Sequence, residues 1–152
     1  MVSNHVKLHI RQQQFHNLAS QGIEVKGIRV VCFASFKSGD QYTEEEAGIV
    51  DTGTAISIIP QRIWSNLPFK RIAENKLWGL STHPESFERS IFGEVVCRLQ
   101  DEQNHTSDFS LRADLVYNDD IPLVLGFLDL IERGVLHIHL STNDHYLEFP
   151  FV

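Results

Sequence analysis

Cysteine is scarce in this chain: only Cys32 and Cys97 occur among its 152 residues. Both lie within apolar segments, so we expect two buried, reduced thiols and no disulfide bond. A chain without disulfide staples is typical of a reducing compartment. We therefore predict a cytoplasmic location.

Long hydrophobic runs are also missing. The chain has no run of about 18 consecutive apolar residues, the length that a membrane span needs. The N-terminal sequence, MVSNHVKLHIRQQQFHNLAS, has no apolar core of the length found in a signal peptide. We therefore expect no interaction with a membrane.

Basic residues are outnumbered: 13 Lys and Arg stand against 20 Asp and Glu, and the formal net charge is −7. A negative charge of this size opposes any sequence-independent attraction to phosphate backbones. Nucleic acid is therefore excluded as an expected partner.

The sequence contains enough apolar residues to form a folded core. Hydrophobic residues make up 42% of the chain, and a domain of this length buries roughly two-thirds of the surface of its unfolded chain. We find no internal repeat or linker, so we expect one domain over residues 27–142. Residues 1–26 form an N-terminal segment whose structure the pattern does not define, and residues 143–152 form an extended C-terminal segment.

Hydrophobicity alternates with a period of two through most of the chain, which predicts a mainly β protein. The expected strands cover residues 28–36, 41–50, 55–59, 77–80, 91–99, 109–117, the run IPLVLG, and 135–140. The strand over 109–117 alternates most cleanly, so we expect it to be buried on one face only. Pro60 favours a short helix over residues 61–64. Gly134 favours the end of a second short helix, FLDLIER, by occupying its C′ position.

Residues 49–60, IVDTGTAISIIP, place one aspartate between two apolar segments. An ionised carboxylate in such a position is costly to bury unless neighbouring donors compensate it. Asp51 therefore lies either at a turn into solvent or at a built site. Asp-Thr-Gly is also good chemistry for an Asx turn between two strands, so a purely structural role stays open.

A second motif follows later in the chain, where an apolar strand ends in glycine directly before the second expected helix. Its residues are Val124, Leu125 and Gly126. Together with Asp51-Thr52-Gly53, this order and spacing resembles the retropepsin-like aspartic proteases, the single-domain relatives of pepsin that act as homodimers. The resemblance covers roughly residues 27–142. It implies a retropepsin-like closed β-barrel, the single lobe of the acid-protease fold, with one or two short helices.

The resemblance also implies an aspartic endopeptidase in which Asp51 activates water. Hydrolysis by this route needs a base for the water and an acid for the carbonyl oxygen and the leaving amine. Two carboxylates that share one proton supply both, and the aspartic-protease dyad is the standard case. Because this chain has a single Asp-Thr-Gly, the second aspartate must come from another copy across a two-fold axis. We expect a homodimer, a peptide or protein substrate, and neither a cofactor nor a metal.

The same resemblance assigns roles to the residues that follow the aspartate. Thr52 is implied to bond the backbone of the second copy across the axis. Gly53 is implied to permit a tight turn that brings its N–H to the carboxylate, and Thr54 to bond the outer carboxylate oxygen. Ala55 and Phe127 stand where retroviral members often have an acid and an arginine, which leaves the packing of the dimer undefined.

The polar stretch STHPESFERS, residues 81–90, joins two of the expected strands. The resemblance places at residues 77–95 the flap of the family, the hairpin that closes over substrate. A lid and a plain exposed loop are both open readings of this segment.

Three other interpretations bear on function. A non-catalytic retropepsin-like module would keep the fold for dimerisation or peptide binding. Phosphoryl transfer on the aspartate is a chemical alternative, although the lysine of a phospho-aspartyl motif is missing here and Gly53 stands where a dehalogenase-like phosphatase needs a second Asp. His137 and His139 share one strand face, with His145 following. Because no Cys, Asp or Glu stands at ligand spacing, we expect exposed or interface histidines rather than a zinc site.

Overall fold

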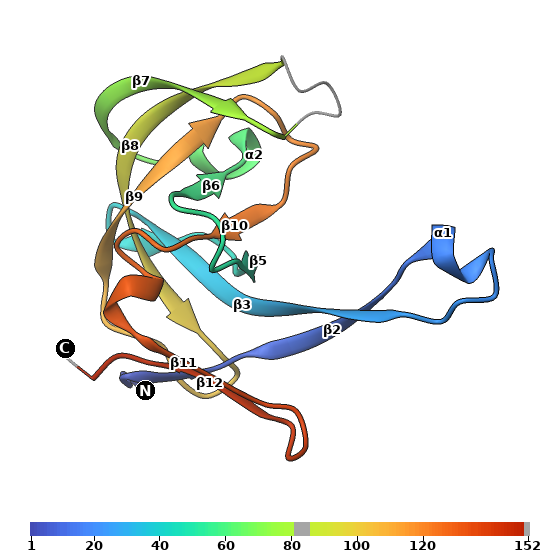
Figure 1. Cartoon of the computed structure of the whole chain (residues 1–152). Coiled ribbons are helices and arrows are strands. Elements are labelled where there is room, and N and C mark those ends of the chain that lie inside the picture. The colour runs from blue at the N-terminus through green and yellow to red at the C-terminus, as the bar shows by residue number, and fades with distance from the viewer. Residues whose placement is uncertain (81–85, 151–152) are drawn as a thin grey trace.

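The structure, a computed structural model, describes residues 1–80 and 86–150 and is mainly β. Each strand predicted from the period-two pattern overlaps an observed strand, so the predicted class is confirmed. The strands form two sheets (Figure 1). The smaller sheet is antiparallel throughout, in the order β1 (His5–Lys7), β12 (Asp144–Glu148) and β11 (Val135–His139).

The larger sheet contains the rest of the strands and is mixed. Its order is β2 (His9–Gln14), β3 (Lys26–Ser38), β5 (Glu46–Val50), β10 (Leu123–Leu125), β6 (Ser57–Ile59), β9 (Phe109–Val116), β8 (Phe87–Gln100) and β7 (Lys70–Trp78). The short β4 (Gln41–Tyr42) pairs with β3. β3 also pairs with β8, with Phe33 opposite Gln100 and Phe36 opposite Cys97. β7 begins seven residues before the predicted strand over 77–80, and it ends before Gly79, whose φ of +85° turns the chain.

Helical structure is limited to short elements, α1 (His16–Ala19), α2 (Gln61–Trp64) and the 3₁₀ turn η1 (Ile131–Arg133). The prediction of a helix over 61–64 is confirmed, with Pro60 as its N-cap residue. Trp64 anchors this helix, since its Nε1–H donates to the carbonyl oxygen of Val116 at 2.7 Å. Among the residues that the structure describes, no helix is long and apolar enough to span a membrane.

The prediction of a second helix over FLDLIER is wrong. Asp129 has a φ of +61°, and Leu130 has φ −126° and ψ −81°, so helical geometry is broken before Ile131. Gly134 is extended, with φ −123° and ψ 176°, and is not a left-handed C′ residue. A Cβ at Gly134 would lie 3.0 Å from the carbonyl oxygen of Glu148, so this glycine allows β11 to begin close to the backbone that follows β12.

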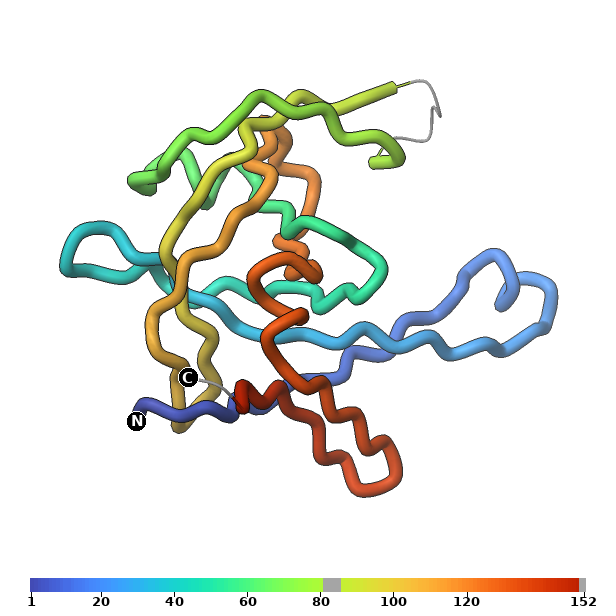
Figure 2. Tube along the Cα trace, turned by 60° about the vertical axis from the view of Figure 1, so that its left-hand side comes forward, coloured from blue at the N-terminus to red at the C-terminus, as the bar shows by residue number. Residues whose placement is uncertain are grey.

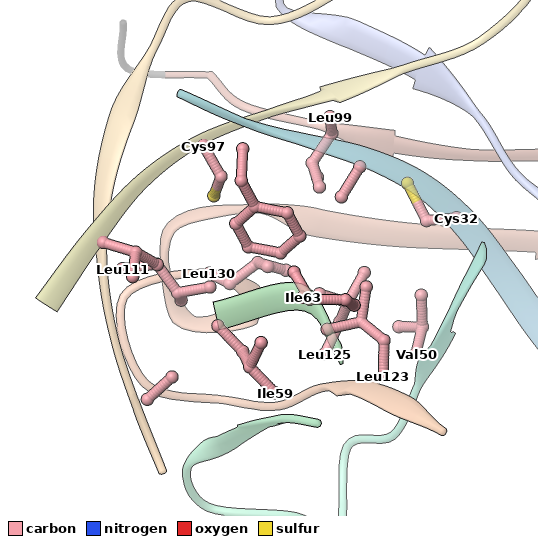
Figure 3. Close-up of a cluster of buried hydrophobic side chains, with 14 of the residues drawn as sticks. Cys32, Val50, Ile59, Ile63, Cys97, Leu99, Leu111, Leu123, Leu125 and Leu130 are labelled. Carbon is pink, nitrogen blue, oxygen red and sulfur yellow. The ribbon is translucent and has the colours of Figure 1, made fainter. Parts of the chain in front are cut away.

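The hydrophobic core gathers side chains from both halves of the chain (Figure 3). The face predicted to point inward from β3 is fully buried at Cys32, Ala34 and Phe36. The alternation itself is not confirmed, because Val31 and Ser35 on the opposite face are only 2% exposed. The prediction that the strand over 109–117 is buried on one face only is wrong at Asp114 and Val116, which are also fully buried. The reason is that β9 is an interior strand, paired with β6 on one side and β8 on the other.

The segments outside residues 27–142 also reach the core. Val6, Leu8 and Leu147 are buried members of the core cluster. β1 and β12, which carry two of them, pair with each other, so the N-terminal and C-terminal segments lie side by side (Figure 1). The folded body is therefore larger than the segment predicted for the domain.

Both cysteines are buried and unpaired, as predicted. Burial raises the pKa of the Cys32 thiol to about 12, and it raises the pKa of the Cys97 thiol as well. A thiol that stays protonated is a poor nucleophile. Neither cysteine is therefore a candidate for catalysis.

One part of the chain leaves the body of the protein. Residues 11–29, which we call the arm, comprise most of β2, the short α1 and the beginning of β3, and they project away from the rest of the molecule (Figure 2). No residue of the arm is buried. The N-terminal pattern did not predict this hairpin, because its strands lack the regular alternation of a half-buried strand.

Candidate active site

The connection between β5 and β6 crosses a third strand. These two strands follow each other in the chain, but β10 lies between them in the sheet. Residues 51–56, which we call the Asp51 loop, therefore pass over the end of β10. Because β5 and β10 are parallel, with Val50 opposite Leu125, Asp51 and Gly126 leave the sheet at the same edge. Carboxyl ends of parallel strands are a common place for functional groups to converge.

Backbone hydrogen bonds join the two sequence motifs at this edge. The N–H of Asp51 donates to the carbonyl oxygen of Leu125 at 3.0 Å. On the other side of the glycine, the N–H groups of Phe127 and Leu128 donate to the carbonyl oxygens of Thr54 and Ala55, each at 2.9 Å. The structure thus brings together the segments around Asp51 and Gly126, which are far apart in the chain.

Gly126 makes the crossing possible. A Cβ at this position would lie 2.7 Å from the carbonyl oxygen of Thr54 and 3.0 Å from the backbone of Ile56 and Ser57. These are backbone atoms, which have little freedom to move aside. The N–H of Gly126 donates to Oγ of Ser57 at 2.9 Å, and Ser57 is fully buried. Ser57 was missed in the sequence, where the only signal was one hydroxyl inside an apolar run.

The carboxylate of Asp51 accepts two hydrogen bonds from its own loop. Oδ1 accepts from the N–H of Gly53 at 2.9 Å, and Oδ2 accepts from Oγ1 of Thr54 at 2.8 Å. A Cβ at Gly53 would lie 3.3 Å from Oδ1, so glycine leaves the approach open. The first bond is also that of an Asx turn. An Asx turn does not require the bond from Thr54. With this bond, both oxygens of the Asp51 carboxylate have a donor that fixes their orientation.

The tip of the loop faces outward. Asp51, Thr52 and Gly53 are all exposed. Among the residues described by the structure, no basic side chain forms an ion pair with Asp51. An exposed carboxylate that is oriented by hydrogen bonds but not neutralised by a cation is available to an approaching molecule.

The hairpin of β7 and β8 occupies the position predicted for the flap. Trp78 and Phe87 pair across its outer end with ring centroids 5.2 Å apart. A groove of about 1170 Å³ follows the hairpin, and Asn75, Ser90 and Tyr117 contribute to its lining together with both aromatic rings. The expected polar loop over 81–90 is wrong for its last four residues, which belong to β8. Within the segment predicted as the flap, 77–95, residues 81–85 lie outside the described residues.

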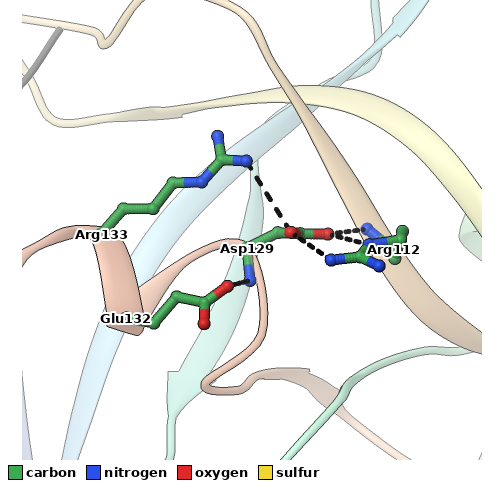
Figure 4. A network of polar contacts seen from close by, with 4 residues as sticks. All are labelled: Arg112, Asp129, Glu132 and Arg133. Atoms are coloured by element: carbon green, nitrogen blue, oxygen red, sulfur yellow. Dashed lines mark hydrogen bonds and ion pairs between the residues drawn. The ribbon is translucent and has the colours of Figure 1, made fainter.

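A second aspartate lies close to the Asp51 loop, but in a very different setting (Figure 4). Asp129 accepts two bonds from the guanidinium of Arg112, Nε to Oδ2 at 2.7 Å and Nη2 to Oδ1 at 2.9 Å. Its backbone N–H donates to Oε1 of Glu132 at 2.7 Å, and Arg133 lies 3.7 Å from Oδ1. The hydrogen bonds from Arg112 lower the pKa of Asp129. This network was not predicted from the sequence, because β9 and the turn after β10 meet only in the fold.

A third aspartate is buried where β9 lies beside the β7–β8 hairpin. Oδ1 of Asp114 accepts from Nδ2 of Asn75 at 2.8 Å and from Oγ of Ser90 at 3.2 Å, so it joins β9 to both strands of the hairpin. Oδ2 has no hydrogen-bond partner within residues 1–80 and 86–150. Burial raises the pKa of this carboxyl group. From the sequence alone, Asp114 was one of the polar residues expected to point outward from this strand.

On the smaller sheet, the rings of His137 and His139 stack with centroids 6.0 Å apart, next to Tyr146. Nε2 of His137 lies 3.1 Å from Oε2 of Glu148, and its ring stacks on Tyr146 with centroids 4.2 Å apart. His145 is buried rather than exposed, and its Nδ1 accepts the N–H of His139 at 3.2 Å. In the described part of the chain, no group of three or more His, Cys, Asp or Glu side chains is placed to hold a metal ion.

Neither a comparison with models of protein families nor a search of curated protein sequences finds a match to this chain. Its function is therefore argued from the geometry of the Asp51 loop.

Proposed function

We propose that this protein is a retropepsin-like aspartic endopeptidase that works as a homodimer, with one Asp51 from each copy at a shared active site. The observation that carries the proposal is the pair of hydrogen bonds to the Asp51 carboxylate, from the N–H of Gly53 and the hydroxyl of Thr54. These donors hold the carboxylate in one orientation while leaving it exposed. That is the arrangement required of a group that acts on a bound water.

The mechanism needs two such carboxylates that share one proton. The ionised Asp51 takes a proton from water, which attacks the peptide carbonyl carbon. The protonated Asp51 of the second copy donates to the carbonyl oxygen, which gives a gem-diol. As the C–N bond breaks, the first Asp51 passes its proton to the leaving nitrogen and the second takes a proton back from a diol hydroxyl, so that the pair again shares one proton. Because each chain carries one Asp-Thr-Gly sequence, a two-fold axis beside Asp51 is required to assemble the pair. We propose that the exposed Thr52 bonds the second copy across this axis.

The pairing of the strands supports the acid-protease fold. The ladder from β3 through β5, β10, β6 and β9 to β8 returns to β3 through a further pairing. Such a return favours a closed barrel. The passage of the Asp51 loop over Gly126, with the hydrogen bonds of Phe127 and Leu128 to that loop, supports the same assignment.

We propose an extended peptide as the substrate. The groove along the β7–β8 hairpin, of about 1170 Å³, combines aromatic side chains with polar ones, and none of its lining residues in the described part of the chain belongs to the Asp51 loop. It would therefore hold a part of the peptide away from the cleaved bond. Strand-like main-chain bonding to an extended segment would favour unfolded or linker regions of a protein substrate. The two reduced cysteines support a cytoplasmic site of action.

The decisive experiment compares the parent with Asp51→Asn on an unstructured fluorogenic peptide library. We expect cleavage to disappear in Asp51→Asn while circular dichroism and the thermal midpoint stay unchanged, because the side chain is exposed and the amide is nearly isosteric. Asp40→Asn, a matched change at another exposed aspartate, should cleave like the parent. Cleavage should depend on pH in a bell shape, since one carboxylate must be ionised and the other protonated. It should also resist chelators.

Two outcomes would contradict this proposal. An Asp51→Asn variant that cleaves at the parent rate would move the chemistry to another site. A parent that forms a dimer and binds peptides by calorimetry without cutting them would instead support the non-catalytic retropepsin-like module. The two outcomes differ in the parent's activity, so one peptide assay and one titration separate them.

A further inference from the structure

The arm has no core of its own. From residue 11 to residue 29 every side chain is exposed or partly exposed. β3 pairs with β5 only as far as Val30 opposite Val50, so beyond that point the arm consists of two strands and a short helical turn. A two-stranded hairpin by itself is at best marginally stable in water. The arm therefore needs a further contact to be a lasting part of the structure.

The arm also carries exposed apolar side chains. Phe15, Ile23, Val25 and Ile28 are each exposed by more than 40%. The ring of Phe15 lies over Gly27, where a Cβ would come within 2.9 Å of it, so one aromatic ring is partly covered by the arm's own backbone. Exposed apolar side chains in one segment make the arm a candidate interaction surface.

The charge of the arm is opposite to that of the body. The arm holds three basic residues, Arg11, Lys26 and Arg29, and one acidic residue, Glu24. Its formal charge is therefore +2, within a chain of −7, which leaves −9 on the rest. Opposite charge favours an encounter between the arm of one molecule and the body of another.

The position of the arm determines which surface of a second copy it would contact. β5 ends at Val50 and is followed at once by Asp51, while β3 continues past that point into the arm. The arm consequently runs outward past the edge where the Asp51 loop lies (Figures 1 and 2). A second copy related by a two-fold axis beside Asp51 would therefore lie next to the arm.

We infer that the arm is a dimerisation clasp: in the homodimer, each arm packs its apolar side chains against the body of the second copy beside the Asp51 loop. The occupant of this surface is thus another copy of this chain. The position of the two-fold axis in this inference rests on the proposed function. The argument that the arm needs a covering partner does not. It also supplies an interface outside the active-site loops, which is useful because Ala55 and Phe127 offer no ion pair there.

The first test measures the dimer dissociation constant of the full chain by sedimentation over a dilution series. Val25→Ser combined with Ile28→Ser removes two exposed apolar groups from each arm, and we expect the dimer to weaken about ten-fold to a hundred-fold. Leu140→Ser is the matched control, because Leu140 is 61% exposed in the turn after β11. It should leave the constant unchanged. Added salt should weaken the parent dimer, since opposite charges are screened.

The second test locates the arm directly. A photo-crosslinking residue in place of Gln21, at the exposed turn of the arm, is activated in an equal mixture of isotopically light and heavy chains. A clasp predicts crosslinked peptides of mixed isotope, joining the arm to residues of the body. Crosslinks confined to single chains would overturn the inference, as would arm variants whose dimer is as tight as that of the parent.

These readouts keep the two proposals apart. If the arm variants dimerise normally and still cleave peptide, the clasp is refuted and the endopeptidase stands. If the dimer depends on the arm but the parent cuts nothing, the clasp stands and the catalytic proposal fails. A parent that is monomeric at every concentration refutes the clasp.

Discussion

Two neighbouring loops of this protein hold an aspartate each, and they place it in opposite settings. The Asp51 loop leaves its carboxylate exposed and bonded only to donors of the same loop. In the turn that follows Gly126, Asp129 is buried and paired with the guanidinium of Arg112. The loops are in direct contact through the N–H of Phe127 and the carbonyl oxygen of Thr54.

The difference shows what distinguishes a structural carboxylate from an available one. Arg112 reaches Asp129 from β9 and satisfies both of its oxygens, so nothing remains for an incoming molecule. Asp51 receives two neutral donors and no cation from the residues that the structure describes. Neutral donors orient a carboxylate without cancelling its charge. The first loop is therefore suited to chemistry, and the second to holding β9 against the turn.

The largest effect on stability should come from Gly126→Ala, which disturbs the close contact between Gly126 and the Asp51 loop. Its Cβ would lie 2.7 Å from the carbonyl oxygen of Thr54, so the Asp51 loop must shift. We expect a loss of about 3 kcal/mol in the free energy of unfolding, measured by urea denaturation. Gly39→Ala is the control, because Gly39 has a φ of +64° but open space around its Cβ position. It should cost about 1 kcal/mol from backbone strain alone. Equal losses for the two variants would mean that close packing at Gly126 is unimportant.

A smaller effect is expected for Asp129→Asn, which keeps a residue that tolerates positive φ and removes only the charge. Breaking a buried ion pair costs several kcal/mol, but the side chain of Arg112 is 42% exposed and solvent screens it. We expect a loss of about 2 kcal/mol at neutral pH in the same urea assay. Asp51→Asn should change the free energy of unfolding by less than about 1 kcal/mol, since its carboxylate is exposed.

The pH dependence of this loss follows from the direction of the pKa shift. The folded state lowers the pKa of Asp129, chiefly through the hydrogen bonds from Arg112. The folded state then binds fewer protons than the unfolded state between the two pKa values, so the stabilisation is complete above the unfolded value. It disappears as the pH falls through the lowered folded value. Parent and Asp129→Asn should therefore converge in acid, and a gap that persists there would contradict the ion-pair account.

The same comparison explains how far the sequence could predict the site. The Asp51 loop is a local feature, because the carboxylate of Asp51 and its donors on Gly53 and Thr54 lie within four consecutive residues. The apolar residues on either side indicate the flanking strands. The packing of this loop on Gly126 was not predicted, because the order and spacing of the two motifs do not say that they are in contact. Asp129 was missed because its partner is 17 residues away on another strand, and strand register is not a property of local sequence.

The fold was predictable to a similar depth. Hydrophobic patterning identified strands from β3 to β11 but missed β1, β2 and the first seven residues of β7. Proline identified the start of α2. FLDLIER failed as a helix because its pattern is helical while Asp129 takes a left-handed conformation to meet Arg112, a tertiary contact that overrides local preference. The arm was not predicted, for the opposite reason. Residues that pack against nothing within one chain carry no periodic signal, and only the structure shows that they pair.

A change of Thr54 should have a small effect on stability, and it decides whether the Asp51 loop is only a turn or also orients a functional carboxylate. Thr54→Val removes the hydroxyl that donates to Oδ2 at 2.8 Å while keeping the shape of the side chain. We expect it to lower the free energy of unfolding by about 0.5–1.5 kcal/mol, whereas Thr54→Ser, which retains the donor, should stay within about 0.5 kcal/mol of the parent. Peptide cleavage should separate the variants more clearly than stability does. The hydroxyl holds Oδ2 of Asp51 in place, so its loss should slow cleavage, while Thr54→Ser should keep the parent rate. If Thr54→Val cleaves at the parent rate, the hydroxyl serves only the turn, and the orientation of Asp51 depends on the N–H of Gly53.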